Sequence, residues 1–313
     1  MPQPADISEA VAGFARTLRD GGIVAFPTET VYGLGADATN SDAVLKIYET
    51  KGRPRFNPLI VHCADLAMAE TLAVFSPLAR RLTALWPGPL TLVLPRREEA
   101  AISDLVTADL PTIGIRIPAH PLAQALIAAV GRPLAAPSAN PSGRLSPTTA
   151  QQVIEAFGGA VPVLDGGPCK AGLESTILAV GEGGVTQLRA GALARDDLEA
   201  YLEQPIATAS ADSAITAPGM MLSHYAPNAS VRLNAERPGP GEAYLAFGKA
   251  PQGDFLTRNL SPSGDLREAA RNLFSMLHEL DRSADRIAVS PIPRTGLGEA
   301  INDRLERAAS PRP

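Results

Sequence analysis

Helical and extended patterns alternate along the first two hundred residues of the chain. Residues 6–20 carry apolar side chains at helical spacing, and the run 23–26 is apolar at every position. Residues 41–52 return to helical spacing and precede a second apolar run at 59–63. Strands that are apolar on both faces lie in the middle of a sheet that is covered on both sides. The alternation therefore predicts a large α/β domain with a twisted, mixed sheet.

The alternation continues through the second half of this region. Ser146 followed by a proline is typical of a helix cap and first turn, and it predicts a helix from Ser146 to Phe157. The segments 161–164, 175–180 and 185–189 have the composition of strands. These elements complete the large domain.

Both patterns stop after residue 204 and return near residue 231. A chain of 313 residues exceeds the length at which a single hydrophobic core usually divides. The segment between the two regions is rich in Ala, Ser, Thr and Pro, and irregular segments of this length are usually linkers or functional lids. We therefore predict a large domain over 1–204, a linker or lid over 205–230, and a small Rossmann-like α/β domain over 231–313.

The composition argues against several classes of protein. The net charge is −5, so no overall positive field attracts the chain to nucleic acid or to anionic lipid. Cys63 and Cys169 are the two cysteines and form no C-x-x-C pair, which argues against a disulfide framework or a zinc site. The N-terminal residues lack the basic start of a signal peptide, and no apolar run approaches membrane-spanning length. We expect a cytoplasmic protein with no membrane contact.

The strongest cluster of positive charge follows the helix predicted at 41–52. Lys51 and Arg53 flank Gly52, and prolines after Arg53 and Asn57 bias both residues toward extended backbone. A flexible lysine and a forked arginine on such a stiffened turn could hold a polyphosphate. The spacing alone gives equal support to an ordinary basic helix end exposed to solvent.

Other polar residues lie in or beside apolar strands. Arg116 shares a strand face with Gly114 rather than with the neighbouring isoleucines, so its guanidinium requires an anion, either an internal carboxylate or a ligand. The remaining candidates are polar groups at strand ends, namely His62, Thr112, Ser138, Asn140, Ser175 and Arg189. Together they indicate one cleft that is suited to a phosphorylated ligand. Common nucleotide-binding, hydrolase and metalloprotease motifs do not occur in the sequence.

Seven segments, in this order, carry a family resemblance: "PTETVYGLGADA", "KGRPRFNPLIVH", "LWPGPLTLVL", "IGIRIP", "APSAN", "ESTI" and "LRAG". They resemble the YrdC-type threonylcarbamoyl-AMP synthases over about residues 10–200, and the paired K-x-R and S-x-N elements are specific to that family. The segment "APGMMLSHYAP" followed by a small α/β domain resembles the long, two-domain form.

The resemblance implies a nucleotidyltransferase that makes threonylcarbamoyl-AMP and pyrophosphate from L-threonine, bicarbonate or carbon dioxide, and ATP. It implies that magnesium accompanies ATP, with no dedicated metal site, and that a downstream tRNA threonylcarbamoyl transferase complex uses the product. The residues implied to hold L-threonine are Thr30, His62, Arg116, Ala136 and Ser175. Those implied to hold ATP are Lys51, Arg53, Asn57, Thr112, Ser138, Asn140, Ser146, Arg189 and Tyr225, with Lys51 and Arg53 as the catalytic pair.

Two alternatives compete with this interpretation. A non-catalytic, RNA-binding translation factor would use Lys51, Arg53 and Arg55, although the acidic net charge and few aromatic residues oppose it. The same loop leaves room for a weak tRNA contact by the enzyme. A carbamoyltransferase of hydrogenase maturation would contain a related module, but this chain lacks the zinc-finger cysteines expected there. We further expect the segment 217–227 to fold over the cleft and place Tyr225 near ATP.

Overall fold

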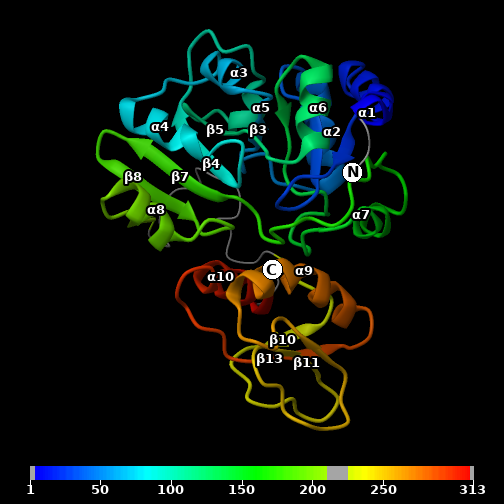
Figure 1. The fold of residues 1–313 in the computed structure, drawn as a ribbon. Coiled ribbons are helices and arrows are strands. Elements are labelled where there is room, and N and C mark those ends of the chain that lie inside the picture. The colour runs from blue at the N-terminus through cyan, green and yellow to red at the C-terminus, as the bar shows by residue number, and fades with distance from the viewer. Residues whose placement is uncertain (1–3, 210–224, 311–313) are drawn as a thin grey trace.

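The computed structural model describes residues 4–209 and 225–310, which form two α/β domains (Figure 1). The predicted α/β fold with a large mixed sheet and a smaller C-terminal domain is confirmed. The segment 210–224, which contains most of the predicted lid, lies outside the described residues.

A sheet of nine strands organises the large domain, in the order β1-β2-β6-β3-β5-β4-β7-β8-β9. The pairs β3–β5, β4–β7 and β8–β9 are parallel, and the remaining neighbours are antiparallel. The strands are β1 (Val24–Phe26), β2 (Gly33–Asp37), β3 (Ile60–His62), β4 (Leu90–Pro95), β5 (Thr112–Arg116), β6 (Leu134–Ala135), β7 (Thr176–Gly181), β8 (Gly184–Arg189) and β9 (Ala207–Thr208).

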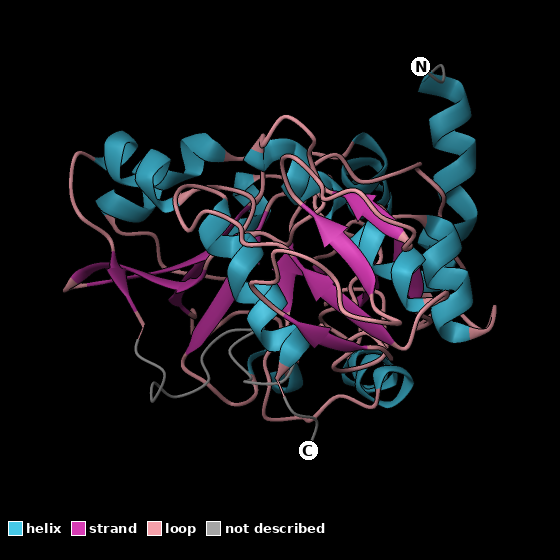
Figure 2. Ribbon diagram, turned by 90° about the horizontal axis from the view of Figure 1, so that it is seen from below, coloured by secondary structure: helices cyan, strands magenta, loops and turns pink. Residues whose placement is uncertain are grey.

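The first helices of the large domain lie on the side away from the small domain, whereas its last two helices lie lower in the view, nearer to the small domain (Figure 1). In Figure 2, which is viewed from below, the N-terminal helix runs along one edge of the molecule. Helices α1 and α6 pack on each other through apolar residues such as Val11 and Leu126. The helices are α1 (Pro4–Arg19), α2 (Ser41–Lys51), α3 (Leu66–Glu70), α4 (Pro77–Leu82), the short 3-10 helix η1 (Thr83–Leu85), α5 (Asp104–Thr107), α6 (Pro121–Val130), α7 (Ala150–Phe157) and α8 (Arg195–Leu202).

The alternation of side chains in the central strands decides which residues reach the other face of the sheet. In β5, Ile113 and Ile115 enter the main hydrophobic core, whereas Gly114 and Arg116 alternate with them and point the other way. In β3, Val61 enters the core, and Ile60 and His62 point to the same side as Arg116. The sequence-based placement of Arg116 on the face of Gly114 is therefore confirmed.

The small domain is built on a parallel sheet of four strands, in the order β10-β13-β11-β12. Its elements are β10 (Ser230–Arg232), β11 (Ala243–Ala246), β12 (Thr257–Asn259), α9 (Leu266–Asp281), β13 (Arg286–Val289) and α10 (Gly298–Ala309). Both helices lie on the side of this sheet that faces the large domain (Figure 1). The hydrophobic core of the small domain includes Val31, Leu145 and Leu173 of the large domain, so this core extends across the interface.

Three predicted elements differ from the structure. Helix α7 begins at Ala150 rather than at Ser146, because Thr149 and Gln152 form a capping box at its start. The segment 161–164 forms a single bridge to Ala25 rather than a strand. Strand β9 lies inside the segment 205–230 that was predicted to be irregular, where it pairs with β8 at the sheet edge.

No helix of the described ranges is both long enough and apolar enough to span a bilayer.

Candidate active site

A pocket lies on the face of the large sheet that carries Arg116, and Tyr225 from the segment between the two domains also lines it. It receives polar side chains from the β1–β2 loop, the turn after α2, strands β3 and β5, the segment after β6, and the β7–β8 hairpin. The lining residues are Thr28, Thr30, Val31, Gly33, Arg53, Ile60, His62, Arg116, Ala136, Pro137, Ser138, Glu174, Ser175, Arg189 and Tyr225. Nine of these were predicted from the sequence to bind a substrate, so the structure brings most of the predicted site together.

The loop 27–30 is fixed by its own hydroxyl groups. Thr28 Oγ1 donates to the carbonyl of Val31 at 2.6 Å and accepts from the amides of Thr30 and Val31. Thr28 Oγ1 also lies 2.7 Å from Thr30 Oγ1. A loop held in this way needs no regular secondary structure to present Thr30 to the pocket.

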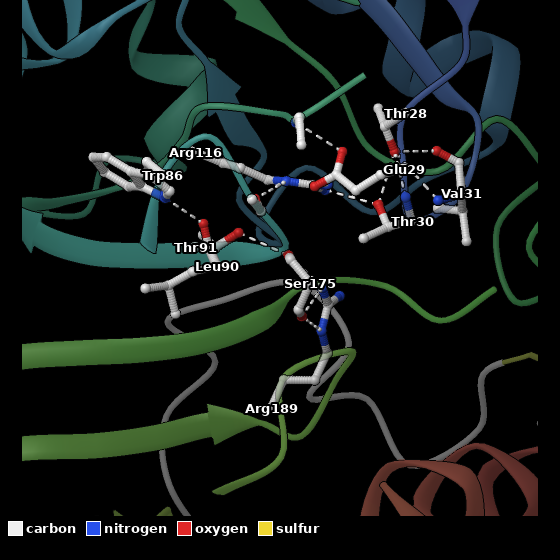
Figure 3. Close-up of polar contacts among 12 residues, drawn as sticks. Thr28, Glu29, Thr30, Val31, Trp86, Leu90, Thr91, Arg116, Ser175 and Arg189 are labelled. Atoms are coloured by element: carbon white, nitrogen blue, oxygen red, sulfur yellow. Dashed lines mark hydrogen bonds and ion pairs between the residues drawn. The ribbon is translucent and has the colours of Figure 1, made fainter. Parts of the chain in front are cut away.

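Arg116 extends from the end of β5 toward this loop (Figure 3). Its Nη1 donates to Thr30 Oγ1 at 2.9 Å, and its Nη2 pairs with Glu29 Oε1 at 2.6 Å. The other oxygen of Glu29 accepts from the amide of Ala119 at 3.0 Å. The anion that the sequence required for Arg116 is therefore an internal carboxylate, although the guanidinium also lines the pocket.

Arg53 reaches the pocket from the turn that ends α2. Gly52 adopts the left-handed conformation (φ 60°) as the helix C-cap, which directs the chain away from the helix axis. Arg53 Nε then donates to the carbonyl of Asn57 at 3.1 Å, and Nη2 donates to the carbonyl of Pro58 at 2.8 Å. Burial, with a smaller repulsion from Arg189, lowers the pKa of Arg53 to about 10, so the guanidinium stays charged at neutral pH.

Lys51 makes a different contact from the one the sequence suggested. Its Nζ donates to the carbonyls of Ser138 and Asn140, and it does not line the pocket. Burial, and to a smaller extent the charge of Arg53, lowers the pKa of Lys51 well below its ordinary value. In this structure Lys51 fixes the segment after β6, which presents Ser138 to the pocket.

His62 contributes a neutral ring to the pocket. Burial, and to a smaller extent the charge of the neighbouring Arg116, lowers the pKa of His62 to about 3. Its Nδ1 is buried and has no hydrogen-bond partner among the described residues. An unpaired buried nitrogen is costly, so this atom is a ready contact for a polar ligand.

The β7–β8 hairpin supplies the opposite wall. Figure 3 shows Ser175 between Thr91 and Arg189. Ser175 Oγ lies 2.7 Å from Thr91 Oγ1, and Arg189 Nη2 donates to the carbonyl oxygen of Ser175 at 2.8 Å and to its hydroxyl at 3.2 Å. Arg189 and Ser175 are therefore presented as one unit.

Five predicted site residues do not line the pocket: Lys51, Asn57, Thr112, Asn140 and Ser146. Ser146 is fully buried beside it and donates from Oγ to Glu174 Oε1 at 2.5 Å. Thr112 shares the strand face of Arg116, about 13 Å away along β5. A ligand longer than the pocket would reach Thr112 by following that face.

Sequence reasoning missed two acidic residues at this site, Glu29 and Glu174. Glu29 follows Thr28 in the polar run after β1, and Glu174 lies two residues before the start of β7. Both positions are strand ends, so the rule that selected Ser175 and Arg189 would also have selected these carboxylates.

The charge of the pocket is unbalanced in favour of anions. Three guanidinium groups line it, from Arg53, Arg116 and Arg189, against the single lining carboxylate of Glu174. Within the described residues no carboxylate forms an ion pair with Arg53. The same ranges contain no group of three or more His, Cys, Asp and Glu side chains that could hold a metal. The arrangement suits an anionic ligand.

Two family models match the chain. Residues 16–191 match the Sua5_yciO_yrdC family model, described as "Telomere recombination", and residues 193–310 match the model described as "Threonylcarbamoyl-AMP synthase, C-terminal domain".

Relatives named threonylcarbamoyl-AMP synthase occur in Bacillus subtilis and Pyrococcus abyssi. Each is 39% identical to this chain; the alignments cover 96% and 95% of the chain and 93% and 92% of the relatives. The crystal structure of Pyrococcus abyssi Sua5 complexed with L-threonine superposes with a TM-score of 0.88 at 38% identity, covering 96% of this chain and 94% of that one. These matches support the catalytic interpretation and not the RNA-binding alternative. The chain belongs to the threonylcarbamoyl-AMP synthase family, in its two-domain form, and is an enzyme of that type.

Proposed function

We propose that the pocket joins L-threonine, bicarbonate or carbon dioxide, and ATP into threonylcarbamoyl-AMP and pyrophosphate. The observation that carries this proposal is the charge of the pocket, where three arginines meet one carboxylate beside a neutral histidine. Such a site favours a ligand with several negative charges at one end and a small polar ligand at the other.

The end of the pocket near β3 and β5 suits L-threonine. The Arg116 guanidinium would hold the amino-acid carboxylate, and the Glu29 ion pair would keep that guanidinium in place. His62 Nδ1, without a partner in the described residues, would contact the amino acid. Thr30, Ala136 and Ser175 would complete this part of the site. The L-threonine complex of the Pyrococcus abyssi relative supports the choice of amino acid.

The end near Arg53 and Arg189 suits the triphosphate. These two guanidinium groups would bind phosphate oxygens, and Ser138 and Tyr225, which also line the pocket, would contribute further contacts to ATP. The other residues implied to hold ATP would support the site from further along the sheet or from behind the lining residues: Thr112, Asn57, Asn140, Ser146 and Lys51. Mg²⁺ would arrive bound to ATP.

The chemistry would rest on positioning and charge neutralisation. The amine of threonine attacks the carbon of carbon dioxide and loses a proton to give the carbamate; from bicarbonate, the same carbamate forms with release of water. A carbamate oxygen then attacks the α-phosphorus of ATP while the bond to pyrophosphate breaks. A carbamate is a weak nucleophile, so the two arginines would lower the barrier by stabilising the charge that develops on the leaving pyrophosphate. The labile product would pass to a tRNA-modifying transferase complex, which we place in the cytoplasm.

One assay tests the proposal. Purified protein with ATP, Mg²⁺ and bicarbonate should release pyrophosphate when L-threonine is present and much less when it is omitted. Release that does not depend on threonine would reject the proposed reaction and leave only a general ATPase.

A further inference from the structure

The C-terminal domain sends one arginine into the large domain. Arg304 projects from α10, which lies at the face of the small domain that meets the large one (Figure 1). Its side chain is fully buried and is the largest of the fully buried side chains among the described residues. A guanidinium without water needs partners on all sides, because burying an unpaired charge costs several kcal/mol.

Three partners of Arg304 belong to the pocket or adjoin it. Nε pairs with Glu174 Oε2 at 2.8 Å, and Nη2 donates to the carbonyl of Ala190 at 2.9 Å, next to Arg189. The guanidinium carbon lies 4.8 Å from the centre of the Tyr225 ring, which is a cation–π distance. A fourth contact, to Asp303, stays within α10.

Glu174 extends this contact to Ser146. Glu174 Oε1 accepts from Ser146 Oγ at 2.5 Å while Oε2 accepts from Arg304, so the carboxylate is held between the two domains. Burial alone would raise the pKa of Glu174, but Arg304, followed by Arg189, outweighs burial and holds that pKa below its ordinary value. From α9, His278 Nε2 contacts the carbonyl of Ser146 at 3.3 Å. Both helices of the small domain therefore converge behind the wall of the pocket formed by Glu174 and Tyr225.

We propose that Arg304 is a positioning residue: it reaches from the C-terminal domain to hold Glu174 and Tyr225 at the ATP end of the pocket. The identity of the ligand as ATP rests on the proposed function. Without Arg304, Glu174 loses the partner that most lowers its pKa, and Arg189 remains as the cation that stabilises the carboxylate. Glu174 then competes with the triphosphate for Arg189. The contacts of Arg116 with Glu29 and Thr30 do not involve Arg304, so threonine binding stays intact.

A second arginine at the domain interface serves as a control, because it contacts the other domain without contacting the pocket. Arg282, the residue that caps the C-terminus of α9, pairs with Glu155 of α7 across the same interface, but both side chains are about half exposed and neither lines the pocket. If the arginines only hold the domains together, replacing Arg304 or Arg282 has similar effects on the site. If Arg304 positions the pocket wall, only its replacement weakens ATP binding.

The test is calorimetric titration of Mg-ATP, and separately of L-threonine, into the full-length wild type and four variants. We expect Arg304→Met to weaken ATP binding roughly tenfold to hundredfold, as loss of a charged hydrogen bond does, with threonine affinity within twofold. Arg304→Lys, which keeps the charge without the fork, should recover part of the loss. Arg282→Met should bind both ligands like the wild type.

The double variant Arg304→Met with Glu174→Gln should bind ATP more tightly than Arg304→Met alone, because the uncompensated carboxylate is gone. Unchanged ATP affinity in Arg304→Met, an equal loss in Arg282→Met, or no recovery in the double variant would each overturn the proposal. An equal loss of threonine affinity in Arg304→Met would also overturn it, because a collapsed pocket loses both ligands. Pyrophosphate release by the wild type tests the proposed function separately, since these affinities do not depend on turnover.

Discussion

Replacing Arg53 with alanine should remove a direct contact with the triphosphate. The guanidinium carries five N–H donors. Two of them donate to the carbonyls of Asn57 and Pro58, and the side chain also hydrogen-bonds to Tyr48, so the remaining donors can meet a ligand in the pocket. One charge-assisted hydrogen bond contributes about 1.5–3 kcal/mol, which corresponds to a loss of one to two decades in kcat/KM for ATP.

The assay is pyrophosphate release at saturating L-threonine and bicarbonate with ATP varied. Arg55→Ala is the matched control, because Arg55 is an exposed cation two residues further along the same turn. Arg53→Lys should lie between the wild type and Arg53→Ala, since it keeps the charge but not the planar fork. Thermal unfolding of each variant checks that the turn remains folded. A change below threefold in Arg53→Ala, or an equal loss in Arg55→Ala, would refute the assignment of Arg53 to the phosphates.

Three further predictions concern the threonine end of the pocket. Glu29→Gln removes the charge that orients Arg116. In steady-state assays it should raise KM for L-threonine about tenfold and leave KM for ATP nearly unchanged. Parallel increases in both KM values would contradict a local role of Glu29. L-Valine should replace L-threonine at least a hundredfold less well in pyrophosphate release, because hydroxyl-binding groups of the site would be left unpaired, and equal rates would contradict the proposed pocket. The pKa of His62 is about 3 in the folded protein against an ordinary value of 6.5, so between these values the unfolded chain binds a proton at His62 and the folded chain does not. The free energy of unfolding should therefore fall as the pH is lowered from 6.5 toward 3. Urea unfolding at pH 7 and pH 5 should show a smaller difference between the two pH values in His62→Gln than in the wild type.

The parts of the fold that depend on local pattern could be predicted from the sequence. The isoleucines beside Arg116 fixed its strand face, and Gly52 predicted where α2 ends. Strand β2, with glycine at positions 33 and 35, lacks the composition of a strand, because its place in the sheet depends on pairing with β1 and β6. Ser146 looked like a helix cap, but tertiary contacts direct its hydroxyl to Glu174.

The candidate site also contains residues that could be predicted from local sequence pattern and residues that could not. Arg53, His62, Arg116 and Ser175 lie beside strands or turns that the pattern identifies, and all four reach the pocket. Lys51 could not be distinguished from a phosphate ligand by spacing, because its carbonyl partners come from residues about 90 positions later in the chain. No feature of the sequence around Arg304 predicted a buried residue beside the pocket. A cation on an amphipathic helix is usually exposed, and only the packing of α10 on the large domain makes this one buried.

The formation of a carbamoylated adenylate from bicarbonate is the central claim, and isotope labelling tests it most directly. The purified protein is incubated with ATP, Mg²⁺, L-threonine and isotopically labelled bicarbonate, and the quenched products are separated and analysed by mass spectrometry. The account predicts a threonine-dependent AMP conjugate that carries one labelled carbon, in amounts equal to the pyrophosphate released. A threonine–AMP conjugate without the label, or AMP as the sole nucleotide product from the first turnovers onward, would contradict it.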